Sequence, residues 1–220
     1  VRRRERSIRH QAGRALAGSA AVGAAVALWW GKTATALLLA KGMVEALRAR
    51  GKLPSHLDEC YIGVLDTERD SAQLYSHLVT FDAITLEPPY SPERYVGAMK
   101  QLVRAGYPVI IVDQITHEWF GDGGVLSMVA NAKGQNDWAK WNGPSQEHEA
   151  FIDYQLNIPA HLIATMRSHT EYVLEKNDQG KFVPRRVGMK AKQREGTEYE
   201  YTTVLDLEVG TNRATCTKDR

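Results

Sequence analysis

The sequence predicts an α/β fold with a mostly parallel central sheet, helices on both of its faces and an antiparallel edge near the C-terminus. Short apolar runs typical of buried strands alternate along the chain with helical segments, which is the pattern of a parallel sheet. The run YPVIIVD at 107–113 is continuously apolar and rich in β-branched residues. Such a run is expected of a central strand that is covered on both faces.

The helices and strands follow in order along the chain. Residues 34–52 carry apolar side chains near a 3.6-residue period and are predicted to form a helix that ends at Gly51. A second helix has Ser91 as its N-cap, Pro92 as its first residue and Gly106 at its end. The other predicted elements are a helix at 145–157 and strands at 60–66, 81–86, 107–113 and 160–166.

The C-terminal part of the chain is predicted to be extended. Residues 170–186 contain two extended segments around the turn residues 177–180, which predicts a β-hairpin. Two further strands at 202–209 and 213–218 are close in sequence. We expect them to supply the antiparallel edge of the sheet.

Charge is unevenly distributed. The formal net charge is +2, yet residues 1–14 carry six Arg and one Glu, and residues 167–194 carry eight Lys or Arg and three acidic residues. The rest of the chain is therefore acidic. Two basic segments on an acidic body indicate a polyanionic partner; solvated loops are the alternative for the second segment.

The two cysteines, Cys60 and Cys216, are far apart, and the sequence contains neither C-x-x-C nor HExxH. A structural zinc site and a disulfide scaffold are therefore not expected. Both cysteines are predicted to be small buried side chains in a reducing compartment.

The segment 1–30 differs in composition from 31–220, which we expect to form the functional domain. It is rich in Arg, Ala and Gly and contains no Lys. Basic residues precede an Ala-rich run, as in a secretory signal or a weak membrane anchor. A wrong reading frame of GC-rich coding DNA would also produce this composition. The remainder of the chain indicates a cytoplasmic protein.

Part of a phosphate-binding motif precedes the first predicted helix. Gly31, Lys32 and Thr33 match the last three positions of G-x-x-x-x-G-K-[ST], in which the lysine reaches the phosphates and the hydroxyl binds magnesium. A helix N-terminus at this position favours an anion. The first glycine of the motif is missing, because its position holds Val26, and two tryptophans stand just before Gly31.

Carboxylates stand at the ends of two predicted strands. Asp113 ends the strand at 107–113, and Asp66 and Glu68 stand at the end of the strand at 60–66. Because ligands gather at the carboxyl ends of parallel strands, we expect Lys32, Glu68 and Asp113 to converge. Asp113 is predicted to hold magnesium, and Glu68 to orient an attacking water molecule.

Several segments resemble, in order, the RecA-like P-loop ATPases of bacteriophages and prophages, often labelled AAA-family ATPases. The resemblance covers 31–220 and fails over 1–30, where that family has a strand and a complete glycine-rich loop. The matching segments are GVLDTERDSAQLY, FDAITLEPPYSPERY, AGYPVIIVDQITHEW, IATMRSHTEYVLE, VPRRVGMKAKQREGTEYEYTTVLDL and TCTKDR.

The resemblance implies a RecA-like P-loop core that binds ATP and Mg2+. Lys32 and Thr33 then take the phosphate-loop roles, and Asp113 takes the magnesium role. Glu68 matches the catalytic glutamate after the second strand. Glu118 is the alternative base, and its other interpretation is an acidic residue at the start of a helix.

The resemblance also implies an oligomer that acts on DNA. Thr165 falls at a nucleotide-sensing position, and Arg167 begins a DNA-binding loop. Lys218 and Arg220 fall where RecA-like proteins reach the nucleotide of a neighbouring subunit, which implies a ring or a filament; a basic C-terminus without that role is the alternative. The basic residues expected to contact single-stranded DNA are Arg167, Arg185, Arg186, Lys190, Lys192 and Arg194.

Two aromatic side chains are also considered for DNA binding. Tyr172 and Phe182 are placed to stack on bases, although core packing is the alternative for Phe182.

The sequence therefore favours an ATPase that acts in DNA recombination or replication. A nucleotide-binding or DNA-binding scaffold protein that does not turn over ATP is the main alternative. A membrane-anchored ATPase is a third.

Overall fold

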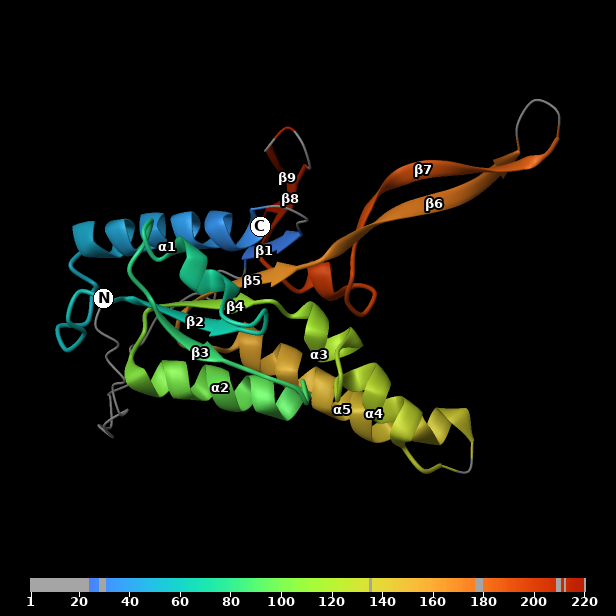
Figure 1. Cartoon of the computed structure of the whole chain (residues 1–220), viewed down its shortest axis with the longest axis horizontal. Helices are drawn as coiled ribbons and strands as arrows, with labels where there is room; N and C mark the ends of the chain where they lie inside the picture. Colours follow the sequence, from blue (N-terminus) through green and yellow to red (C-terminus); the bar gives the residue numbers. More distant parts are fainter. Residues whose placement is uncertain are drawn as a thin grey trace.

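The computed structural model describes residues 24–27, 31–134, 136–176, 180–208, 211 and 213–219. Within these residues, a seven-stranded sheet forms the centre of the molecule (Figure 1), with the strand order β3-β2-β4-β5-β1-β8-β9. Neighbouring strands run parallel except at the β8–β9 edge, which is antiparallel. The strands are β1 (Ala24–Ala27), β2 (Ile62–Asp66), β3 (Asp82–Thr85), β4 (Val109–Asp113), β5 (His161–Met166), β8 (Thr203–Leu207) and β9 (Ala214–Asp219).

Helices cover both faces of the sheet. Helix α1 packs on one face, with Leu37 in a core shared with β2 and β4. Helices α2 and α5 lie on the other face (Figure 1), where Tyr95 of α2 meets Phe151 of α5. All five residues of β4 are buried, as expected of a central strand. The predicted α/β class, its mostly parallel sheet and its antiparallel edge are therefore confirmed. The helices are α1 (Lys32–Ala49), α2 (Pro92–Ala105), α3 (Thr116–Phe120), α4 (Val125–Asn131) and α5 (Asp137–Leu156), with 3-10 turns η1 (Ser71–Tyr75) and η2 (Thr197–Tyr199).

Local sequence signals explain some boundaries better than others. Helix α2 begins at Pro92 after an extended Ser91 and ends at Gly106, whose φ of 88° is readily adopted only by glycine. Helix α5 begins earlier than predicted, because the Asn136 side chain accepts a hydrogen bond from the Ala139 amide and caps it there. Pro144 thus lies inside the helix. The short helices α3 and α4 were not predicted.

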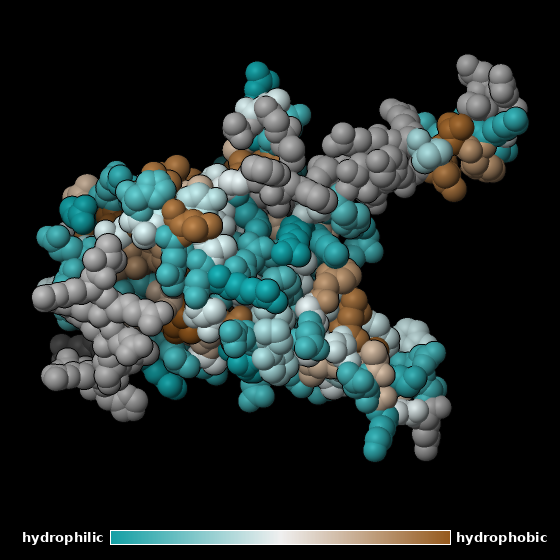
Figure 2. Space-filling view, viewed as in Figure 1, coloured by the Kyte–Doolittle hydropathy of each residue, from teal (hydrophilic) through white to brown (hydrophobic). Residues whose placement is uncertain are grey.

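The predicted hairpin forms a separate two-stranded sheet. Strands β6 (Ser168–Lys176) and β7 (Phe182–Ala191) pair antiparallel. They extend away from the body as an arm, which stands clear of the other elements in the ribbon view (Figure 1), and the coloured residues at the far end of the arm lie apart from the body in Figure 2. The base of the arm follows directly from β5, so the hairpin begins at the carboxyl edge of the parallel sheet.

The predicted burial of the cysteines is wrong for Cys216. This side chain is exposed because β9 is the edge strand, and Cys60 is only partly buried; both thiols are free. In the described part of the chain, no helix is long and apolar enough to cross a membrane. The segment 1–30 lies outside the described residues apart from the backbone of β1, which pairs with β5 and β8 inside the sheet.

Candidate functional site

The candidate site begins at the N-terminus of α1. Gly31 precedes the helix with a φ of 81°, and its carbonyl oxygen accepts a hydrogen bond from the Thr35 amide at 2.8 Å. The first turn of the helix contains no acidic residue. The unpaired amides and the dipole at this end of an 18-residue helix favour an anion.

The connection between β1 and α1 differs from a complete phosphate loop. Strand β1 continues to Ala27, and the backbone of Val26 pairs with Thr165 and Leu205. Residue 26, where the motif would place its first glycine, is therefore part of a strand. Only residues 28–31 remain between β1 and α1.

Lys32 forms an ion pair with Glu68. The Lys32 Nζ donates a hydrogen bond to Glu68 Oε2 at 2.5 Å, and both side chains are largely buried. The other carboxylate oxygen, Oε1, accepts hydrogen bonds from Arg167 Nη2 at 2.8 Å and from Gln114 Nε2 at 2.5 Å. Burial by itself would raise the pKa of Glu68, but the bonds from Lys32 and Arg167 outweigh it and lower the pKa. Glu68 is therefore an ionised carboxylate at neutral pH.

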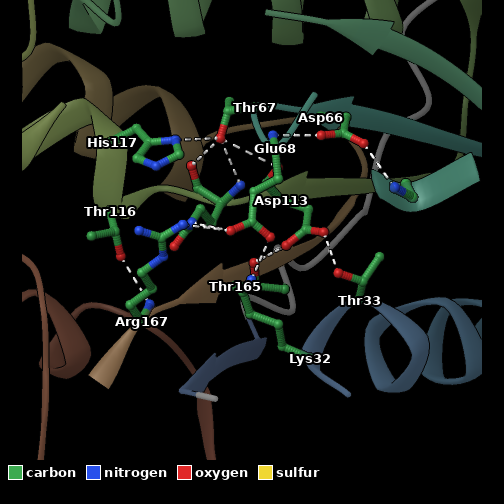
Figure 3. A network of polar contacts seen from close by, with 12 residues as sticks. Lys32, Thr33, Asp66, Thr67, Glu68, Asp113, Thr116, His117, Thr165 and Arg167 are labelled. Atoms are coloured by element: carbon green, nitrogen blue, oxygen red, sulfur yellow. Dashed lines mark hydrogen bonds and ion pairs between the residues drawn. The ribbon is translucent and has the colours of Figure 1, made fainter. Parts of the chain in front are cut away.

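Asp113 lies beside this pair at the end of β4. Its Oδ2 accepts a hydrogen bond from the Thr33 hydroxyl at 2.5 Å, and its Oδ1 accepts one from the Thr165 hydroxyl (Figure 3). The side chain is completely buried. Burial raises the pKa of Asp113, and the positive charge of Lys32 and the two hydroxyl groups oppose this rise.

A second strand-end carboxylate holds the loop that carries Glu68. Asp66 Oδ1 accepts a hydrogen bond from the Glu68 amide at 2.6 Å, and Oδ2 accepts one from the Ala72 amide at 2.9 Å. The Thr67 amide donates to the Asp113 carbonyl oxygen at 2.7 Å, which ties this loop to the end of β4. Asp66 thus fixes the position of Glu68, and Figure 3 shows its hydrogen bond to the Glu68 amide.

Thr67 and His117 extend the polar network but were not predicted. The Thr67 Oγ1 lies 3.0 Å from His117 Nδ1, and the His117 ring stacks on Tyr90 at a centroid distance of 4.8 Å. Burial and the nearby charge of Arg167 lower the pKa of His117, so the imidazole is neutral at pH 7. No sequence motif marks this contact, because Thr67, Tyr90 and His117 lie in three separate segments of the chain.

Glu118 lies in a different environment. It is fully buried, and its carboxylate contacts His148 Nδ1 at 3.0 Å and Gln193 Nε2 at 3.2 Å. Burial raises its pKa. The structure brings together Lys32, Thr33, Glu68, Asp113, Thr165 and Arg167, but it does not bring Glu118 into hydrogen-bond contact with any of them.

The base of the hairpin is joined to the site through Arg167. The side chain of Arg167 forms an ion pair with Glu68. Its carbonyl oxygen accepts a hydrogen bond from the Lys192 amide at 2.6 Å, and its amide donates one to the Thr116 hydroxyl at 2.9 Å. Arg167 therefore connects Glu68 with the residues at the base of both hairpin strands.

The other predicted DNA-binding residues lie along β7 and the loop that follows it. The Lys192 ammonium lies over the ring of Phe120, and the Arg194 guanidinium lies over that of Trp119. Lys190 pairs with Glu195 at 2.8 Å. Arg185 and Arg186 are placed in β7 by its backbone pairing, and their side chains are outside the described residues.

The four remaining predicted residues belong to the hairpin, namely Tyr172 and Phe182, and to the C-terminal end of the sequence, namely Lys218 and Arg220. Phe182 is 64% exposed at the distal end of the hairpin, which contradicts core packing. The side chain of Tyr172, which is predicted to stack on bases, is outside the described residues. The Lys218 ammonium, on β9, donates to the Tyr199 carbonyl oxygen, and Arg220 is outside the described residues.

The residues near α1 fit a magnesium ion that arrives with a nucleotide. Magnesium prefers oxygen ligands and takes one or two from protein and the rest from phosphates and water. The Thr33 hydroxyl and the Asp113 carboxylate are ligands of this kind, side by side. Across the described ranges, no three His, Cys, Asp or Glu side chains form a metal-binding group of their own.

The fold and this site define an α/β protein with a lysine and two carboxylates at the carboxyl edge of a parallel sheet, facing a helix N-terminus. No protein-family model matches the chain, and no curated protein matches its sequence. Among solved structures, it is similar to a KaiC-like protein of the hyperthermophilic archaeon Pyrococcus horikoshii OT3, at 9% sequence identity and a TM-score of 0.44. That match covers 90% of this chain and 79% of the other.

Proposed function

We propose that the chain binds ATP with Mg2+ and hydrolyses it as a RecA-like P-loop ATPase. The observation that carries the proposal is the convergence of Lys32, Glu68 and Asp113 at the N-terminus of α1. Phosphoryl transfer needs positioning and neutralisation of charge more than covalent chemistry. A cation, a magnesium-binding carboxylate and a carboxylate for water are the groups that this chemistry uses.

Each residue has a defined task. Lys32 neutralises charge on the terminal phosphates, together with the amides at the start of α1. Thr33 and Asp113 hold the magnesium ion, which supplies further neutralisation of phosphate charge. Glu68 orients the attacking water, and Thr165 reports the state of the site through Asp113. In the structure Lys32 is paired with Glu68, so phosphates must replace this carboxylate as its partner.

Single-stranded DNA is the proposed polyanionic partner. The hairpin supports this, because its basic residues begin at Arg167 inside the site and continue along β7. Exchange of the Arg167–Glu68 pair during hydrolysis would move the hairpin base. The resemblance of the sequence motifs to bacteriophage and prophage ATPases supports a role in recombination or replication, in the cytoplasm of a bacterial host. Lys218 and Arg220 are proposed to reach the nucleotide of an adjacent copy in a ring or filament.

Hydrolysis in the presence and absence of single-stranded DNA tests the proposal. We expect magnesium-dependent phosphate release that increases with DNA and that Lys32→Ala reduces by at least about 100-fold. Lys41→Ala is the matched control, since Lys41 is an exposed lysine on the same helix. Equal rates for the two variants would contradict the proposal.

A second candidate is a protein of the same fold that binds nucleotide or DNA without turnover. The observation that favours it is the position of Val26 inside β1, which leaves fewer residues for a phosphate loop. In that case ATP binds and is recovered unchanged after long incubation with magnesium and DNA. Phosphate release that depends on Glu68 excludes this second candidate.

A further inference from the structure

We propose that Gln114 is a second group that positions the attacking water: its amide nitrogen holds Glu68, and its amide oxygen accepts a hydrogen bond from the water. The inference rests on the proposed hydrolysis and adds a residue to it. It comes from a buried side-chain atom of Gln114 that has no hydrogen-bond partner and lies beside Glu68.

The backbone of Gln114 is held firmly. It follows directly from β4, and its amide donates to Thr67 Oγ1 at 3.1 Å. Its carbonyl oxygen accepts hydrogen bonds from the Tyr95 hydroxyl at 2.8 Å and from Thr67 Oγ1 at 3.2 Å. Because these contacts come from two other elements, the Cα of Gln114 has a fixed position, and its side chain starts from a defined point.

The orientation of the Gln114 amide follows from chemistry. Gln114 Nε2 lies 2.5 Å from Glu68 Oε1. An ionised carboxylate only accepts hydrogen bonds, so the group that faces it must be the NH2 and not the oxygen. The Oε1 of the same amide therefore lies next to the Glu68 carboxylate, on the same carbon as the bound nitrogen.

The Gln114 oxygen is left without a partner. The side chain is 0% exposed, and Oε1 is one of only two buried side-chain polar atoms in the described residues that make no hydrogen bond; the other is Ser71 Oγ. Buried amide oxygens normally accept a hydrogen bond. A hydrogen-bond donor at this position would satisfy the Gln114 oxygen. During hydrolysis, a water molecule beside Glu68 is that donor.

The partners of Glu68 show how the water is accommodated. Its Oε1 already accepts from Arg167 and Gln114, and its Oε2 accepts from Lys32. When Lys32 turns to the phosphates, Oε2 loses its donor. A water molecule then donates one hydrogen to Glu68 Oε2 and the other to Gln114 Oε1, which leaves a lone pair of the water oxygen for attack.

The step balances with Gln114 unchanged. The lone pair of the water oxygen forms a bond to the γ-phosphorus, and the bond from phosphorus to the β–γ bridging oxygen breaks. The electron pair of that bond leaves with ADP. One proton of the water passes to the Glu68 carboxylate, and the other stays on the oxygen that becomes part of the released phosphate. Gln114 accepts a hydrogen bond throughout and takes no proton, so it is a positioning residue.

The experiment compares Gln114→Ala with Gln155→Ala in the full chain. Gln155 is the matched control because it is also a buried glutamine, and it is hydrogen-bonded to Tyr201 and Phe151 and to none of the site residues named above. We expect Gln114→Ala to lower kcat about 10- to 100-fold and to leave the Kd for MgADP within about twofold. Binding of MgADP with fluoroaluminate, which imitates the transferring phosphoryl group, should weaken about tenfold.

Gln114→Glu supplies a readout that a structural role would not change. It keeps an acceptor oxygen but places a second carboxylate beside Glu68, and a like charge disfavours ionisation of Glu68. The acid limb of the kcat profile should therefore move to higher pH, with activity partly restored at alkaline pH.

Two results would overturn the inference. A kcat for Gln114→Ala within about threefold of the wild-type value, while Glu68→Gln is inactive, overturns it and leaves the proposed ATPase function in place. A loss of kcat matched by Gln155→Ala, with an equal fall in Tm, also overturns it because the effect is then one of stability. If the wild-type chain releases no phosphate, both the inference and the proposed hydrolysis fail.

Discussion

The ammonium group of Lys32 and the carboxylate of Glu68 are in contact, with 2.5 Å between Nζ and Oε2. In the proposed mechanism, one group binds phosphate and the other orients water. Each therefore neutralises the other before ATP binds. This contact makes phosphate binding competitive with an internal carboxylate, and it determines how substitutions at Glu68 should behave.

Removal of the Glu68 charge should tighten ATP binding. In Glu68→Gln, no ion pair has to break before Lys32 can contact phosphate. We therefore expect the Kd for MgATP to fall about three- to tenfold, which corresponds to roughly 1 kcal/mol. Titration with a fluorescent ATP analogue measures this. Glu45→Gln, an exposed glutamate of α1, is the control. Weaker binding by Glu68→Gln would show that the ion pair does not compete with phosphate.

The pH dependence of stability should report the same ion pair. The pKa of Glu68 is lower than its ordinary value of 4.5, so the unfolded chain binds this proton first as pH falls. Its ionised form therefore stabilises the fold above pH 4.5, and this contribution is lost as pH decreases through the folded pKa. Wild-type protein should be about 1 kcal/mol more stable than Glu68→Gln at pH 7, with a smaller difference at pH 4. Urea unfolding at both pH values measures this difference in the free energy of unfolding. A difference that increases as the pH falls would contradict the stabilising role of the ion pair.

Asp113 should reduce stability in the absence of nucleotide. Burial raises the pKa of this carboxylate, so its ionised form is disfavoured in the fold and stability decreases as pH rises through that pKa. Asp113→Asn keeps the side-chain shape and an oxygen acceptor. We expect its Tm at pH 7 to rise by about 2–4 °C, the shift that roughly 1 kcal/mol produces in a chain of this size. Magnesium-dependent hydrolysis should be lost. A lower Tm would show that the charge is stabilising.

Hairpin binding to single-stranded DNA should be sensitive to salt. Lys192→Gln and Arg194→Gln should each raise the Kd for an oligonucleotide about three- to tenfold and reduce the slope of log K against log[salt] by about 0.7 per lost phosphate contact. Fluorescence anisotropy at salt concentrations between about 50 and 200 mM measures both quantities. Over this range, the affinity of a segment that makes a few phosphate contacts should fall by about one decade. Lys41→Gln serves as the control, because Lys41 is an exposed lysine of α1 outside the hairpin. Affinity that does not change with salt excludes phosphate contacts by this segment.

Glu118 should not be the catalytic base. In Glu118→Gln the new side-chain oxygen can still accept a hydrogen bond from Gln193 Nε2, and the new NH2 group can donate one to His148 Nδ1. We therefore expect kcat to stay within about threefold of the wild-type value. Steady-state hydrolysis over a range of ATP concentrations tests this, and a loss of about 100-fold would assign the base to Glu118 instead of Glu68.

Much of the fold could be predicted because it depends on local signals. The apolar run ending at Asp113 and the turn residue Gly106 mark their elements without reference to the rest of the chain. The grouping of Lys32, Glu68 and Asp113 was expected from one general rule about the carboxyl ends of parallel strands.

The remaining features depend on contacts between distant segments. The bond of Gln114 to Glu68 joins two loops 46 residues apart, and nothing in either segment indicates it. Phe182 is exposed because the hairpin stands as a separate two-stranded sheet, whereas its strand pattern was equally compatible with a core position. The Asn136 cap places the start of α5 before Pro144, a residue that more often begins a helix.

The most direct test of the proposed ATPase site compares phosphate release by wild-type protein and by Glu68→Gln. Both are measured at saturating MgATP with single-stranded DNA present. We predict multiple turnovers by the wild type and a rate at least about 100-fold lower for Glu68→Gln, although the variant still binds ATP. Equal rates for the two proteins, or no ATP binding by the wild type at millimolar concentration, would contradict the assignment of this strand-end cluster as an ATPase site.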